Sequence, residues 1–174
     1  MSTKLDLRAL QIGQQEHDLH CHLDILSLHK MERMKHYALH FSKYVGRLAR
    51  GDLEQKPLDA TLVDALLVAL SAANALNQRL HTEDFHIDIR DDSTLEDLAD
   101  AAGRFADACE KMDHLESFRD LALQANHDVI QWVLRRAAEK KFDLGTSLLT
   151  RRKFLATRQA YHSGGDNVLE RRKA

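Results

Sequence analysis

The chain has 174 residues, of which 44% are hydrophobic and 6% aromatic, and its 25 Lys and Arg against 27 Asp and Glu give a formal net charge of −2. With one proline and 7 glycines it lacks the turns of a β-sandwich or barrel, so the composition predicts an all-α protein. The longest nearly apolar stretch, residues 60–76, carries Asp64 and is shorter than the ~20 residues that cross a bilayer, so no membrane partner is expected. The N-terminus has no secretory signal pattern and the 2 cysteines cannot form a disulfide framework, which favours a cytoplasmic protein.

Residues 1–29 form a histidine-rich segment. His17, His20, His22 and Asp24 lie close in sequence and are residue types that ligate transition metals. The set matches no standard zinc spacing, and on a continuous helix His20 and His22 would point to different sides. The sequence therefore favours a role without metal for this segment.

A first helical hairpin is predicted over residues 30–80. Its leading helix, about residues 30–50, ends before Gly51, and its returning helix has Asp59 as a plausible N-cap and runs to about Leu80. The returning helix is apolar on nearly all sides. The apolar residues of the leading helix recur at the three-and-four spacing of one helical face: Met34, Tyr37, Ala38, Phe41, Val45 and Leu48.

A second hairpin is predicted over residues 94–141. Ser93, followed three residues later by Glu96, has the form of a capping box that starts a helix running to about His114. A returning helix follows over about residues 117–141. Loose similarity between the two hairpins suggests an internal duplication, with coincidence between two amphipathic hairpins as the alternative.

The expected architecture is an all-α helical bundle with a four-helix core in residues 30–145. A basic C-terminal segment, residues 146–174, adds one shorter helix over about residues 147–160. Its basic side chains could contact nucleic acid, but no helix-turn-helix pattern or interleaved aromatic residues support that partner. Pairing with the acidic body of the chain is the favoured interpretation.

Basic side chains form a stripe on the leading helix of the first hairpin. His29, His36, His40, Lys43 and Arg47 fall on the side opposite the apolar face. Such a stripe could bind phosphates. A polar stripe is also what any surface helix shows, and the sequence favours that solvated interpretation.

Asp64 is the strongest single candidate for a functional residue. It lies on the apolar returning helix, with Ser71, Asn74 and Gln78 on the same side. A carboxylate on a buried helix needs a cation, a metal or several hydrogen bonds. A metal ligand and a structural partner of an arginine are both open interpretations.

The segments Tyr37–Ala49 and Val63–Asn74 resemble the all-α nucleotide pyrophosphohydrolases of the MazG and dimeric dUTPase type. The resemblance covers about residues 35–78, with a fainter echo over 95–143. That family assembles helical hairpins into a four-helix core and often dimerises, which implies a possible homodimer here. It also implies Mg²⁺-dependent hydrolysis of a (deoxy)nucleoside triphosphate to a monophosphate and pyrophosphate.

The family's acidic residues are only partly present. Where its leading helix has glutamates, in a setting like S-E-E-x-G-E-L-A, this chain has Lys43, Tyr44 and Arg47. Thr61 replaces the glutamate of its E-x-x-D motif, whereas Asp64 is retained. Because a cationic side chain cannot ligate Mg²⁺, the first hairpin alone is not expected to build the metal site.

The resemblance then implies a site spread over both hairpins. Its expected catalytic residues are Asp64 and Asp128. Its expected Mg²⁺ ligands are Asp64, Asp100, Asp128 and Glu96, although the residue pattern itself favours a solvated position for Asp100, Asp128 and Glu96. Its expected substrate contacts are His36, Lys43, Arg47, Asn74 and Arg104. The competing hypothesis is a non-catalytic helical binding module, a pseudoenzyme whose basic stripe binds a nucleotide or a protein partner.

Overall fold

The computed structural model describes residues 5–87 and 93–158, which form seven α-helices and two short 3-10 turns, with no strand among them. The all-α prediction is confirmed. The helices are α1 (Leu7–Cys21), α2 (Leu23–Leu26), α3 (Lys30–Ala49), α4 (Leu58–Leu76), α5 (Leu95–Asp113), α6 (Arg119–Glu139) and α7 (Leu144–Arg158).

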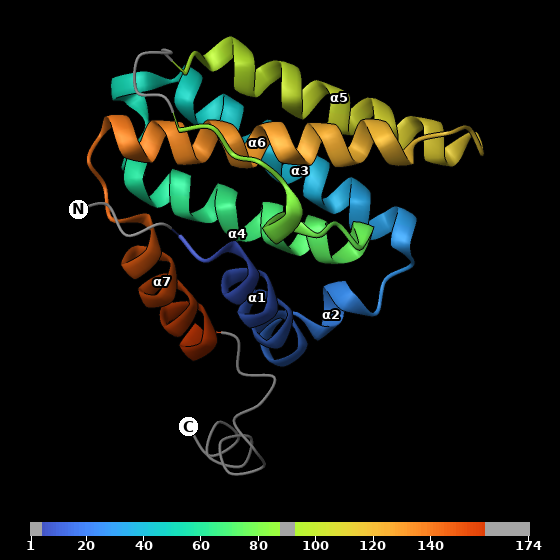
Figure 1. Ribbon diagram of the computed structural model, residues 1–174, viewed down its shortest axis with the longest axis horizontal. Helices are drawn as coiled ribbons and strands as arrows, with labels where there is room; N and C mark the ends of the chain where they lie inside the picture. Colours follow the sequence, from blue (N-terminus) through green and yellow to red (C-terminus); the bar gives the residue numbers. More distant parts are fainter. Residues whose placement is uncertain (1–4, 88–92, 159–174) are drawn as a thin grey trace, which may run out of the picture.

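Four of these helices build the predicted core. The hairpins α3–α4 and α5–α6 pack against each other so that α3 contacts α5 and α4 contacts α6 (Figure 1). Between α3 and α5, the rings of Phe41 and Phe105 meet edge to face, with their centroids 5.0 Å apart. Both rings are fully buried, and this aromatic geometry is a favourable one.

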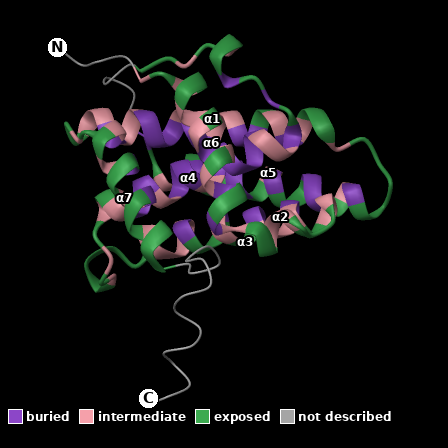
Figure 2. Ribbon diagram, turned by 90° about the horizontal axis from the view of Figure 1, so that it is seen from below, coloured by how far each residue is buried: buried purple, intermediate pink, exposed green. Residues whose placement is uncertain are grey.

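Helix α4 is the central element because it is buried on more than one side. Leu62, Leu66 and Leu70 are fully buried, and α4 is covered by α3 and α6 and also by α1 and α7 (Figure 2). By length and composition α4 could cross a membrane, but 67% of its most apolar window is buried inside the protein. Its apolar character is therefore accounted for by packing.

The ends of α4 differ from the prediction. The helix begins after Pro57, and Asp59 lies in its first turn rather than at the N-cap. It ends at Leu76 rather than Leu80, because Asn77 adopts a left-handed conformation with φ 54°. Asparagine tolerates this conformation better than most residues, which makes it a natural helix stop.

The capping box of α5 lies one residue later than predicted. Thr94 and Asp97 form the reciprocal hydrogen bonds, whereas Ser93 is buried and Glu96 is exposed in the first turn. The indole of Trp132 on α6 donates to the carbonyl of Thr94 over 2.6 Å. This bond joins the start of α5 to α6 and fixes where α5 begins.

A second layer, made of α1, α2 and α7, lies on the face of α4 that points away from α5 (Figure 1). The histidine-rich segment supplies α1 and α2, which are separated by a break at His22. The predicted C-terminal helix is present as α7, and positions 159 and 160 of that prediction lie outside the described residues. A cavity lies between the two layers.

Candidate binding pocket between the two helical layers

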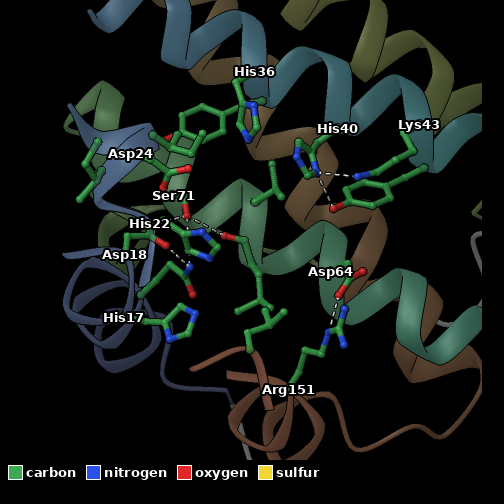
Figure 3. A pocket seen from close by; sticks show the side chains of 18 of the residues that line it. His17, Asp18, His22, Asp24, His36, His40, Lys43, Asp64, Ser71 and Arg151 are labelled. Atoms are coloured by element: carbon green, nitrogen blue, oxygen red, sulfur yellow. Dashed lines mark hydrogen bonds and ion pairs between the residues drawn. The ribbon is translucent and has the colours of Figure 1, made fainter. Parts of the chain in front are cut away.

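A cavity of about 530 Å³ lies between α3 and α4 on one side and α1, α2 and α7 on the other. Figure 3 shows its side chains pointing from these elements toward a shared space. Leu67, Val68 and Leu155 contribute apolar wall. The charged lining residues and histidines are His17, Asp18, His22, Asp24, His36, His40, Lys43, Arg47, Lys56, Asp64, Arg151 and Arg158.

Asp64 is the centre of a cluster of cations at one end of the cavity. Lys56 donates to its Oδ2, Arg151 Nε donates to its Oδ1 over 2.9 Å, and Arg47 Nη1 lies 3.7 Å from Oδ2. The Asp64 side chain is 13% exposed. A carboxylate at this depth is stable because cations surround it, and those cations are in turn held together by Asp64.

Lys43 is held at the same end by a histidine. Its ammonium lies 2.9 Å from Nδ1 of His40, and the Tyr44 hydroxyl lies 3.1 Å from the same nitrogen. Because an ammonium can only donate, His40 Nδ1 accepts, which places the imidazole proton on Nε2. Burial and the nearby Lys43 lower the pKa of His40 to about 4, so this ring is neutral at pH 7.

Polar side chains of α1 and α2 form the other end of the cavity. The Ser71 hydroxyl donates to Asp18 Oδ2 over 2.5 Å, and the Gln14 amide donates to Asp18 Oδ1 over 2.8 Å. Burial is the largest influence on Asp18 and raises its pKa. Next to it, the rings of His17 and His22 meet edge to face, with their centroids 5.4 Å apart.

Two buried nitrogens that belong to lining residues have no hydrogen-bond partner. They are His17 Nε2, near α2, and Arg47 Nη1, near Asp64. A buried donor or acceptor without a partner costs about 1–3 kcal/mol. Such atoms indicate a place where a ligand or water supplies the missing partner.

The structure brings Asp64 and four residues of the basic stripe to one cavity. His36, His40, Lys43 and Arg47 line it together with Asp64, and so do His17, His22 and Asp24 of the histidine-rich segment. The stripe therefore lines a cavity while staying partly in contact with solvent: Lys43 is exposed, and His36, His40 and Arg47 are half-buried. His29 does not line the cavity and is exposed at the N-cap of α3.

The other predicted substrate contacts lie outside the cavity lining. Asn74 donates its amide to the Gln11 carbonyl over 3.1 Å and so joins α4 to α1. Arg104, on the second hairpin, binds Asp100 over 2.8 Å and Asp128 over 2.7 Å. These three polar groups satisfy one another at the surface of α5 and α6.

The predicted Mg²⁺ ligands do not converge. Asp64 faces the cavity on α4, Asp100 and Asp128 are bound to Arg104, and Glu96 is exposed on α5. Within the part of the chain that the structure describes, no three His, Cys, Asp or Glu side chains form a metal-binding group. Mg²⁺ needs several oxygen ligands at once, so these residues, as placed, do not fit it.

The prediction placed Ser71 on the same side of α4 as Asp64, but it did not identify Lys56, Arg151 or Asp18 as part of the site. Lys56 and Arg151 complete the cation cluster, and Asp18 and Ser71 form the polar contact opposite it. The Lys56–Asp64 spacing offered a weak signal, because both residues flank the start of α4. Arg151 is 87 residues from Asp64, and only the fold brings them together.

The chain matches no protein-family model, no curated protein and no solved structure in the comparisons that we made. The cavity and its side chains are therefore the basis for inferring a function.

Proposed function

We propose that this protein is a binding module for a phosphorylated small molecule of about nucleotide size, and that it holds the phosphate directly with cationic side chains. The observation that carries the proposal is the convergence of Lys43, Arg47, Lys56 and Arg151 on one cavity. Arginine and lysine donors are the usual partners of phosphate oxygens.

The dimensions and charge of the cavity support this class of ligand. Small-molecule sites occupy about 300–1,000 Å³, and this cavity is about 530 Å³. Five Lys and Arg side chains line it against three Asp, so it favours an anion. Nη1 of Arg47, which forms no hydrogen bond and lies 3.7 Å from Asp64 Oδ2, is one donor that a phosphate oxygen would satisfy.

In this proposal Asp64 is an internal counter-ion rather than a metal ligand. It neutralises Arg47, Lys56 and Arg151 in the free protein, and an incoming phosphate competes with it for them. Mg²⁺-dependent hydrolysis, which the sequence resemblance implies, has less support because the carboxylates it needs are separated or bound to cations.

The proposal is tested by titrating the protein with pyrophosphate and with a nucleoside triphosphate in the presence of EDTA, using calorimetry. We expect binding without a divalent metal and a loss of about tenfold or more in Lys43→Met, since a hydrogen bond to a charged group contributes about 1.5–3 kcal/mol. Lys35→Met is the matched control, because Lys35 is on the same helix and pairs with Asp113 outside the cavity.

Asp64→Asn separates the two hypotheses. Removal of the competing carboxylate is expected to tighten pyrophosphate binding and to lower the stability of the free protein, which pyrophosphate then restores. Binding that requires Mg²⁺, together with pyrophosphate release from a nucleotide that Asp64→Asn abolishes, would contradict the proposal and favour the hydrolase. Circular dichroism verifies that each variant is folded.

A further inference from the structure

The two ends of the cavity differ in whether their side chains already have partners. At the Asp64 end, Lys56 and Arg151 bind Asp64 and Lys43 binds His40, while Nη1 of Arg47 has no hydrogen-bond partner. At the α1–α2 end, the side chains of His22, Asp24 and His36 form no hydrogen bond or ion pair with the described residues; Asp24 is exposed and the two histidines are half-buried, so a ligand can reach all three. His17 Nε2 is buried there and has no hydrogen-bond partner. Figure 3 shows Asp24 and His22 on one side of this space and His36 on the other.

A phosphate at the Asp64 end leaves most of the cavity to the rest of the ligand, because the cavity is about 530 Å³. The α1–α2 end is unsuited to a purely apolar group, since burying polar side chains without partners is costly. It is also unsuited to a second phosphate, because Asp18 and Asp24 line it. What fits is a neutral group rich in hydrogen-bond donors and acceptors.

The chemistry of these side chains further limits which part of a ligand can bind at the α1–α2 end. Burial, aided by neighbouring positive charge, lowers the pKa of His17 to about 4 and lowers the pKa of His36, so both imidazoles are neutral at pH 7 and each offers one donor and one acceptor. The Asp24 carboxylate only accepts. Hydroxyl groups both donate and accept, and vicinal hydroxyls can donate to the two oxygens of one carboxylate.

We propose, resting on the phosphate-binding function above, that the α1–α2 end of the cavity is a sugar subsite in which Asp24, His22 and His36 bind the hydroxyl groups of a sugar phosphate or of the sugar of a nucleotide. The phosphate lies at the Asp64 end, and Leu67, Val68 and Leu155 form the apolar wall. The ligand class is thus a phosphorylated polyhydroxyl compound.

The test compares three probes by calorimetry in EDTA: methyl phosphate, ribose 5-phosphate and 2-deoxyribose 5-phosphate. Ribose 5-phosphate is expected to bind at least about tenfold more tightly than methyl phosphate, because its hydroxyl groups form hydrogen bonds that methyl phosphate cannot form. The deoxy sugar is expected to bind with intermediate affinity. Asp24→Asn is expected to remove most of the gain, so that ribose 5-phosphate then binds nearly as weakly as methyl phosphate.

Asp52→Asn is the matched control, because Asp52 is exposed in the turn after α3 and does not line the cavity. Equal affinities for methyl phosphate and ribose 5-phosphate would overturn the sugar subsite and leave the phosphate site standing. An equal loss for both probes in Asp24→Asn would also overturn it. If none of the probes binds, the proposed function fails and the subsite fails with it. A gain that appears only after zinc is added would assign this end to a metal and overturn the inference.

Discussion

At the scale of single residues, histidines in this protein respond to their surroundings in opposite directions. His17 and His40 are partly buried next to positively charged groups, and both effects lower the pKa of each to about 4. His127, on α6, instead lies 2.7 Å from a Glu83 oxygen and stacks on Phe85, with the ring centroids 4.4 Å apart. The hydrogen bond to Glu83 is the largest influence on His127 and raises its pKa.

His127 therefore gives a pH-dependent contribution to stability. Because its pKa is higher in the folded state, the contribution is fully present below its ordinary pKa of about 6.5 and is lost as the pH rises through the folded value. His127→Gln is expected to lower the free energy of unfolding by about 0.5–1 kcal/mol more at pH 6 than at pH 9. Urea denaturation at both pH values measures this.

Glu83→Gln should show the same dependence, since it removes the other member of the pair. The two single variants and the double variant form a cycle that isolates the interaction from the lost stacking on Phe85. Equal destabilisation at pH 6 and pH 9 would show that the pair does not supply the pH dependence.

At the scale of the elements, periodicity located α3, α5 and α6 to within a few residues because each has one apolar face. The same reasoning could not place α1, which buries the polar residues Gln14 and Asp18 rather than an apolar face. Prediction of the candidate site from sequence has the same limit. Asp64 was identified from its own helix, but the identity of its partners depends on how α7 packs, and local sequence carries no information about that.

Packing of α7 against α1 depends on one buried cation. Arg152 Nε donates to Gln14 over 2.8 Å, and its Nη2 donates to the Leu10 carbonyl over 2.7 Å. Gly13 permits this approach, since a Cβ at that position would lie 2.9 Å from Arg152 Nη1. The glycine and the arginine together bring α7, and with it Arg151, to the cavity.

Arg152→Met is therefore expected to destabilise the protein by about 1–3 kcal/mol, since it leaves the Gln14 amide oxygen and the Leu10 carbonyl without this donor. Amide hydrogen exchange is expected to accelerate in α7 more than in α5. Pyrophosphate binding is expected to weaken because Arg151 is positioned less well. Lys153→Met is the control, since Lys153 is exposed on the same helix. Unchanged exchange in α7 would show that Arg152 does not hold this helix in place.

At the scale of the whole molecule, the apolar core and the cavity occupy different places. The core lies within α3, α4, α5 and α6, where Phe41, Phe105 and the leucines of α4 pack together. The cavity lies outside this core, between α3–α4 and the layer of α1, α2 and α7. Ligand binding is thus expected to act on the second layer while leaving the packing between α3 and α5 unchanged.

Hydrogen exchange with and without pyrophosphate tests that expectation. At a ligand concentration of 100 times Kd, binding to the native state alone stabilises it by about 2.7 kcal/mol. The gain in protection is expected in α1, α2 and α7, where local opening exposes the cavity, and exchange by local fluctuation in α5 should stay the same. Raising the salt concentration from 0.05 to 0.5 M, values chosen to span roughly 14 to 4 Å of screening length, is expected to weaken binding because the contacts are charged. Uniform protection of all helices, or affinity that does not change with salt, would contradict a cationic site located between the two layers.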